Sequence, residues 1–180
     1  MLSIYRLPNQ LPDEKIIKVL RRDVFILFKK IVLFMFLILL PFAFFYFIIQ
    51  SQNNLLSGQL SYPVIVLGTS AYYLFIWLFF FFSFIDYYLD IWIITNERII
   101  DVQQEGFFSR TIAEQRLYRI QDVTSEVHGF FPTILKYGEV YVQTAGTKQR
   151  FIFYEVPLPD QVRNTIIKLA ERSKRKYGIN

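Results

Sequence analysis

Residues 63–85, PVIVLGTSAYYLFIWLFFFFSFI, decide how the rest of the chain is interpreted. This stretch contains no Asp, Glu, Lys, Arg or His. A helix rises ~1.5 Å per residue and the hydrocarbon core of a bilayer is ~30 Å thick, so a helix of this length can cross it with some tilt. The sequence therefore predicts a transmembrane helix over residues 63–85.

A second apolar stretch, residues 31–49, begins directly after Lys29 and Lys30. Pro41 lies near its middle and predicts a kink, because the ring removes a backbone donor and clashes with the preceding turn. We exclude a signal peptide, because the preceding tail is long, no small-residue cleavage site follows and a second span comes soon after. The two stretches predict an α-helical membrane hairpin, with the small residues 68–71 (GTSA) as a place for close packing.

The charges around the two spans predict the topology. Residues 1–30 hold seven Lys or Arg, whereas residues 50–62 are polar and uncharged. By the positive-inside rule residues 1–30 form a cytoplasmic tail and residues 50–62 an external loop, which places both termini in the cytoplasm. The cations at this membrane foot are Lys15, Lys18, Arg21, Arg22, Lys29 and Lys30. We interpret them as topology signals, with binding of anionic lipid as the alternative.

The tail contains one predicted element, a short amphipathic helix that lies along the inner membrane surface. Asp13 is a candidate N-cap, and Ile16, Ile17, Leu20 and Val24 recur at helical spacing. The cations of the tail occupy much of the other side, which is typical of a helix that lies on a membrane.

Composition limits the chemistry of the chain. Of its 180 residues 53% are apolar and 20 are Phe, and this excess lies before residue 86. The absence of cysteine excludes disulfides and cysteine-ligated metal sites, and the single His128 excludes a histidine-rich one. The chain has no phosphate-binding loop, no hydrolase or kinase motif and no basic stripe interleaved with exposed aromatic residues. We therefore expect no enzyme activity, no cofactor, no metal and no nucleic-acid partner.

From residue 89 onward apolar and polar residues alternate, which predicts a cytoplasmic domain over residues 89–180. The expected strands are residues 89–95, 98–103, 107–115, 117–127, 139–143 and 150–156. Residues 133–137 are expected to form one helical turn between the fourth and fifth strands, and this segment is expected to fill the core with Phe130, Phe131 and Leu135. An amphipathic helix capped by Asp160 follows. This order predicts an all-β small barrel of two nearly orthogonal antiparallel sheets, closed by the C-terminal α-helix.

Several segments of the predicted domain carry a family resemblance. They are residues 92–100 (WIITNERII), Gly106, Arg110, residues 120–123 (IQDV), residues 137–146 (YGEVYVQTAG) and Pro157. Together they resemble the bacterial PH-like domain family of small two-span membrane proteins, formerly a domain of unknown function. The resemblance implies a PH-like fold and a place in the bacterial cytoplasmic membrane, and it implies no catalytic residue.

Five arginines supply the main positive charge of the predicted domain: Arg98, Arg110, Arg116, Arg119 and Arg150. We interpret them as candidate contacts for an anionic surface or an acidic partner, or else as solvated strand residues beside local acids. In phosphoinositide-binding PH domains basic residues surround the first hairpin loop, but here that loop reads Asn96-Glu97, so we expect no specific inositide recognition. Asp86, Asp90 and His128 are interpreted as solvated or structural residues.

The leading hypothesis is a membrane-anchored, non-enzymatic PH-like interaction or scaffolding module at the inner face of the bacterial membrane. A sheet edge, or the groove between a strand and the C-terminal helix, would bind a segment of a partner protein. One alternative is binding or sensing of anionic lipid headgroups by the domain. Another is self-association of the hairpin into an oligomeric membrane assembly or pore. The sequence thus predicts membrane lipids and an unidentified protein, or a second copy, as partners.

Overall fold

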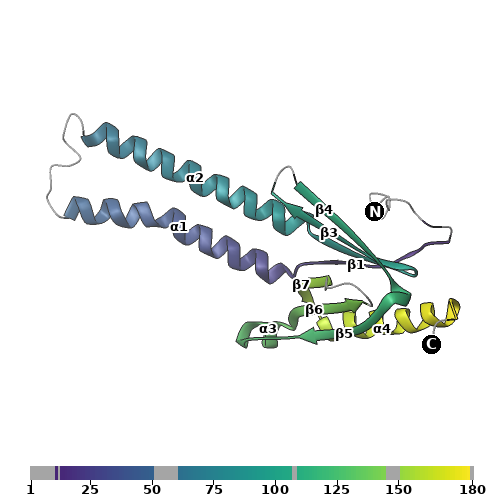
Figure 1. The fold of residues 1–180 in the computed structure, drawn as a ribbon. Helices are drawn as coiled ribbons and strands as arrows, with labels where there is room; N and C mark the ends of the chain where they lie inside the picture. The colour runs from purple at the N-terminus through teal and green to yellow at the C-terminus, as the bar shows by residue number, and fades with distance from the viewer. Residues whose placement is uncertain (1–10, 12, 51–60, 107–108, 145–150, 179–180) are drawn as a thin grey trace. The chain divides into compact units, whose positions relative to one another are not determined.

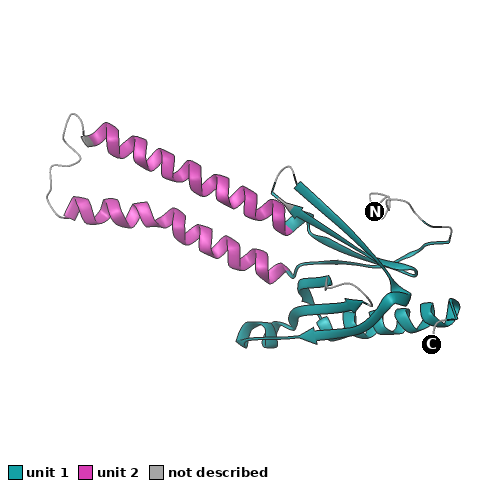
Figure 2. Cartoon of the chain, in the orientation of Figure 1, with its two compact units in different colours: residues 1–23, 88–180 teal, residues 24–87 magenta. Residues whose placement is uncertain are grey.

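The computed structural model describes residues 11, 13–50, 61–106, 109–144 and 151–178. The chain divides into two compact units (Figure 2). One unit, here called the hairpin, comprises Val24–Tyr87, and the other, here called the strand domain, comprises Met1–Asp23 and Tyr88–Asn180. The hairpin is therefore an insertion in the sequence of the strand domain.

The hairpin is formed by α1 (Val24–Gln50) and by α2 (Ser61–Leu89), whose last two residues belong to the strand domain (Figure 1). By length and composition both helices can cross a membrane. Both extend beyond the predicted spans, since α1 includes Lys29 and Lys30 and α2 continues to Leu89. The helical boundaries therefore exceed the apolar stretches at the ends that adjoin the strand domain.

One hydrogen bond between α1 and α2 compensates for a proline in α1. Pro41 has no N–H to donate to the carbonyl of Leu37, four residues earlier in α1. The Tyr72 hydroxyl of α2 donates to that carbonyl at 2.8 Å, and the Tyr73 hydroxyl donates to the Ile38 carbonyl at 3.3 Å. A carbonyl without a partner is costly in an apolar medium, so Tyr72 compensates for the proline. The helix α1 is continuous through Pro41, and its kink stays a prediction.

Aromatic rings supply further contact within the hairpin. The rings of Phe34 and Phe80 lie 5.1 Å apart in an edge-to-face arrangement. At Gly68, by contrast, an added Cβ would meet no atom within 4 Å. The predicted close packing at the small residues is therefore wrong for Gly68, because large aromatic side chains make the contact instead.

The strand domain contains two antiparallel sheets (Figure 1). The first has the order β1 (Ile16–Arg21), β2 (Ile91–Thr95), β3 (Arg98–Glu105) and β4 (Ser109–Arg116). The second has the order β5 (Ile120–Glu126), β6 (Tyr137–Thr144) and β7 (Phe151–Pro157). A short helix η2 (Leu117–Arg119) joins β4 to β5, α3 (Phe130–Leu135) joins β5 to β6, and α4 (Pro159–Lys176) follows β7.

The core lies among the two sheets and α4. Trp92 and Phe153 are fully buried, with ring centroids 5.6 Å apart, and α4 contributes Val162 and Ile166. No pairing joins the two sheets among the described strands, so the predicted closed barrel is not found, and the orthogonal crossing stays a prediction. The predicted cap is also wrong, because Leu158 occupies the N-cap position and Asp160 lies in the first turn of α4.

Residues 16–21 form a strand, so the predicted amphipathic helix is wrong. A bulge between Ile16 and Lys18 interrupts the pairing of β1 with β2. Because of this bulge Ile16 and Val19 pack against the same apolar cluster, whereas Leu20 belongs to the main core. A bulge adds one residue to a strand and breaks its two-residue alternation, so β1 lacks the regular pattern of a strand.

β1 makes the strand domain discontinuous in sequence. Leu20 lies opposite Trp92 and Arg21 lies opposite Ile91, and Leu20 is buried. The predicted domain of residues 89–180 therefore lacks one strand, and the hairpin connects two neighbouring strands of one sheet.

α3 does not fill the core. None of its residues is buried, and Phe130, Phe131 and Leu135 are all exposed. Leu117 and Ile120 are buried in the core with Phe153. The prediction was wrong because a cluster of large apolar residues usually indicates burial, and this cluster lies at the surface.

Candidate functional site

Arg98 lies in the interior of the strand domain, with 5% of its side chain exposed. Its Nε donates to Oε1 of Glu14 at 2.9 Å and its Nη2 donates to Oε2 at 3.0 Å. Arg98 also donates to Glu114, and the Thr95 hydroxyl lies 2.9 Å from Glu14 Oε1. Arg98 is therefore the centre of a buried ion-pair network.

The electrostatics of this network favour two charged partners. Burial opposes ionisation of Glu14, but hydrogen bonds from Arg98, the Leu11 N–H and Thr95 together lower its pKa. Burial likewise opposes the charge of Arg98, yet Glu14 and Glu114 raise the pKa of its guanidinium. The interpretation of Arg98 as a surface contact is therefore wrong, because the side chain is buried and bound to Glu14. Glu14 lies 84 residues earlier in the sequence.

The other predicted arginines do not gather in one place. Arg110 is exposed near the start of β4 and Arg116 is half-buried at its end, so they lie ~20 Å apart along the strand. Arg119 is exposed in η2, with its guanidinium 5.8 Å from the ring centroid of Tyr118. Arg150 lies outside the described residues. A binding role for these arginines stays a prediction.

Arg22 and Asp90 form an ion pair where the chain leaves and re-enters the strand domain. Their Nη2 and Oδ2 atoms lie 2.7 Å apart, and Nη1 of Arg22 lies 3.5 Å from Glu155. Asp90 is buried and accepts the Gln104 N–H at 2.9 Å. The interpretation of Asp90 as a solvated residue is therefore wrong, because it links β1, β2 and β3.

The remaining cations of the membrane foot have scattered environments. Arg21 lies 5.1 Å from the ring centroid of Tyr88, and within the hairpin Lys30 donates to the Ser83 carbonyl at 3.1 Å. Lys15 and Lys29 are exposed, and Lys18 is half-buried. Their role in topology stays a prediction. His128 is exposed, as expected, and lies 3.0 Å from Glu126.

The first hairpin loop of the sheet is occupied by the domain itself. Glu97 accepts hydrogen bonds from Lys176 at 2.5 Å and from the Tyr177 hydroxyl at 3.0 Å. The bond from Lys176 is the main cause of the lowered pKa of Glu97. Asn96 accepts the N–H of Lys15 at 2.8 Å. The loop therefore presents an acid held by the end of α4 rather than a cationic site for a phosphoinositide.

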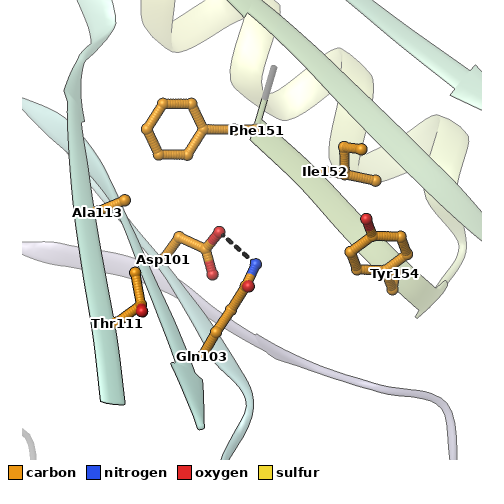
Figure 3. A pocket seen from close by; sticks show the side chains of 7 residues that line it. All are labelled: Asp101, Gln103, Thr111, Ala113, Phe151, Ile152 and Tyr154. Atoms are coloured by element: carbon orange, nitrogen blue, oxygen red, sulfur yellow. Dashed lines mark hydrogen bonds between the residues drawn. The ribbon is translucent and has the colours of Figure 1, made fainter. Parts of the chain in front are cut away.

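A cleft of about 320 Å³ lies between the two sheets (Figure 3). β3 and β4 line it with Asp101, Gln103, Thr111 and Ala113, and β7 lines it with Phe151, Ile152 and Tyr154. Among the described strands β4 and β7 are the edges of their sheets. The cleft is therefore bordered by edge strands, whose outer backbone groups can pair with an added strand.

Asp101 is the acid that lines the cleft, and only one of its two carboxyl oxygens has a hydrogen-bond partner among the described residues. Its Oδ2 accepts a hydrogen bond from Gln103 at 2.9 Å, whereas its buried Oδ1 has no hydrogen-bond partner among the described residues. Burial raises the pKa of Asp101 to about 6; Gln103 opposes the shift, and the charge of Asp90 adds to it. Trp92 lies opposite Asp101 on the neighbouring strand β2 and also lowers this pKa. The buried indole N–H of Trp92 makes no hydrogen bond of standard geometry among the described residues. A ligand with a hydrogen-bond donor would compensate this carboxyl.

This cleft was not predicted from the sequence. One signal was present, because Asp101 is the only charged residue in the run from Ile99 to Val102 of a buried strand. The contribution of β7 had no such signal, since Phe151 and Tyr154 fit an ordinary strand pattern.

Comparisons with known proteins bear on the family of the chain. The family described as bacterial PH domain matches residues 23–170, so its match begins after β1. Among solved structures, a DUF1696 family protein with a pleckstrin-homology domain from Shewanella loihica PV-4 is 18% identical. That similarity covers 45% of this chain and 70% of the other, with a TM-score of 0.38. No curated protein matches the chain at a significant level. Because the family match spans most of the chain, the protein belongs to the bacterial PH domain family.

Proposed function

We propose that this protein is a membrane-anchored, non-enzymatic interaction module. The hairpin would hold the strand domain at the inner face of the bacterial cytoplasmic membrane. Support comes from two helices that are long and apolar enough to span a bilayer and from the lack of charge between residues 31 and 85. A PH-like domain favours binding of lipid or protein, and catalysis has no motif in the sequence.

The cleft beside the edge strands is the observation that carries the proposed interaction. The first four residues of β4 are exposed, and Thr111 and Ala113 line the cleft at strand spacing. An extended segment of a partner protein would add to β4 through backbone hydrogen bonds. Alternate side chains of that segment would enter the cleft, where Asp101 accepts a donor. The function proposed is therefore capture of a protein segment at the membrane surface.

Site-specific photo-crosslinking in native membranes tests this proposal. A photoreactive residue at Thr111, inside the cleft, is expected to give a reproducible adduct with another protein. The matched control is Gln121, which is exposed on β5 outside the cleft. Equal labelling at both positions, or no protein adduct at Thr111, would contradict the proposal. A topology reporter fused after Asn180 is expected to be cytoplasmic, and one inserted near Asn54 is not.

Binding of anionic lipid is a second candidate function, favoured by the end of α4. Its last turn contains Lys174, Arg175 and Lys176, of which Lys176 is engaged by Glu97. In nanodiscs with anionic lipid we expect slower hydrogen exchange in this turn than in zwitterionic nanodiscs, and salt should abolish the difference. Identical exchange in both lipids would remove this candidate.

A further inference from the structure

α3 exposes four large apolar side chains at once. The exposed fractions are 74% for Phe130, 58% for Phe131, 59% for Ile134 and 43% for Leu135. They come from a six-residue helix that contains no buried residue and no charge. Scattered apolar residues are common at protein surfaces, but a contiguous group indicates a contact with another apolar phase.

The local backbone holds α3 as an ordered projection. Gly129 before it and Lys136 after it have positive φ angles, 103° and 57°. The Thr133 hydroxyl and N–H both donate to the Gly129 carbonyl, at 2.7 Å and 3.2 Å. The apolar side chains are therefore presented on a defined turn of helix.

Within the strand domain α3 lies near the point where the chain continues into the hairpin. The Lys136 carbonyl accepts the N–H of Leu158 at 2.8 Å, and the Glu155 carbonyl accepts the N–H of Asp23 at 2.7 Å. Glu155 and Leu158 are three positions apart, which spans at most ~11 Å. Burial raises the pKa of Tyr137, and the negative charges of Glu155 and Asp23 raise it further. Asp23 directly precedes α1.

We propose that the exposed apolar side chains of α3 insert into the interfacial layer of the bilayer that the hairpin crosses. This inference rests on the proposed membrane anchoring. Short connections at Asp23 and Asp90 keep the strand domain at a high effective concentration near that bilayer, so a small apolar patch suffices. Four side chains are few for a stable protein–protein interface, which takes ~20–30 residues a side. Lys136, exposed beside the patch, would lie among anionic headgroups.

Fluorescence quenching by lipid tests this contact in the full chain. The chain has no cysteine, so a single Ile134→Cys variant carries one environment-sensitive dye. In vesicles of phosphatidylethanolamine and phosphatidylglycerol, we expect a blue-shifted spectrum and a loss of fluorescence when bromine-labelled acyl chains are included. Gln121→Cys, exposed on β5, is the matched control and should keep its fluorescence.

A third label separates this inference from the anchoring on which it rests. Ser70 is exposed in α2, and a dye at Ser70→Cys should be quenched if the hairpin spans the bilayer. Quenching at position 70 without quenching at position 134 overturns the α3 contact alone. The same conclusion follows if dyes at position 134 on two copies of the chain quench each other. No quenching at position 70 overturns the anchoring. Adding Phe130→Ser should weaken the quenching at position 134 and leave that at position 70 unchanged.

Discussion

The hairpin and the strand domain treat their internal polar groups in opposite ways. In the hairpin a carbonyl released by Pro41 is satisfied by the neutral hydroxyl of Tyr72. In the strand domain full charges are buried, and Arg98 meets Glu14 through two hydrogen bonds. A folded interior can thus hold an ion pair if every partner is in place, whereas the break at Pro41, within the apolar stretch of α1, is satisfied by an uncharged group.

The largest expected effect comes from breaking the buried ion pair. Arg98→Ala leaves Glu14 buried without its main partner and should cost about 3–5 kcal/mol of unfolding free energy. Urea unfolding of the full chain in detergent micelles, followed by circular dichroism, measures the loss. Arg110→Ala, at an exposed position, should stay within about 0.5 kcal/mol of the natural chain. A neutral Arg98→Ala would mean that the strand domain does not depend on its buried charges.

The next effect concerns the strand contributed from before the hairpin. Leu20→Ala removes a core side chain that is 3% exposed and should cost about 2–4 kcal/mol. Ile17→Ala on the same strand is the control, since Ile17 is 46% exposed and its loss should be much smaller. The same unfolding measurement applies. Equal effects at the two positions would contradict the pairing of β1 with β2.

Asp101 predicts a pH dependence of stability. Its pKa rises from a model-peptide value of 3.8 to about 6 in the folded chain, so the native state holds the proton more tightly than the unfolded one. Its contribution to stability is present below about pH 4 and is lost as the pH rises through about 6, by about 1–3 kcal/mol. Asp101→Asn should flatten this part of the pH profile and stabilise the chain at pH 7. Unchanged profiles would show that Asp101 is compensated.

The smallest effect should come from the hairpin. Tyr72→Phe removes the donor to the Leu37 carbonyl and should cost about 1 kcal/mol, as measured by resistance to unfolding in dodecyl sulfate. In a Pro41→Ala background residue 41 supplies its own N–H, so the same substitution should cost clearly less. Additive effects in this double-mutant cycle would break the link between Pro41 and Tyr72.

Local patterns in the sequence predicted much of the fold. The strands β2 to β7 and α4 were found because alternation and helical spacing survive in them. β1 was missed because its bulge hides the alternation, and its pairing with β2 is a long-range contact. α3 was predicted to lie in the core because apolar residues are usually buried. Composition alone does not distinguish a protein core from another apolar environment.

The candidate site was much less predictable than the fold. Arg98 was grouped with surface arginines because its partner Glu14 lies far away in the sequence. Asp101 gains its character from burial and from neighbours on other strands, which no local pattern contains. Pairing and burial of charges are tertiary properties, so charge counts alone did not predict them.

The pairing of β1 with β2 also has a consequence for biosynthesis. During translation β1 is made first, and its partner strand β2 follows only after both helices of the hairpin. Ile16, Val19 and Leu20 therefore have no partner strand until the second helix is complete. If the helices cross a membrane, β1 and β2 can meet only when both have crossed, because a single crossing would leave them on opposite sides. Completion of the sheet would thus report that insertion had succeeded, and a chain stalled after one crossing would expose an unfinished core.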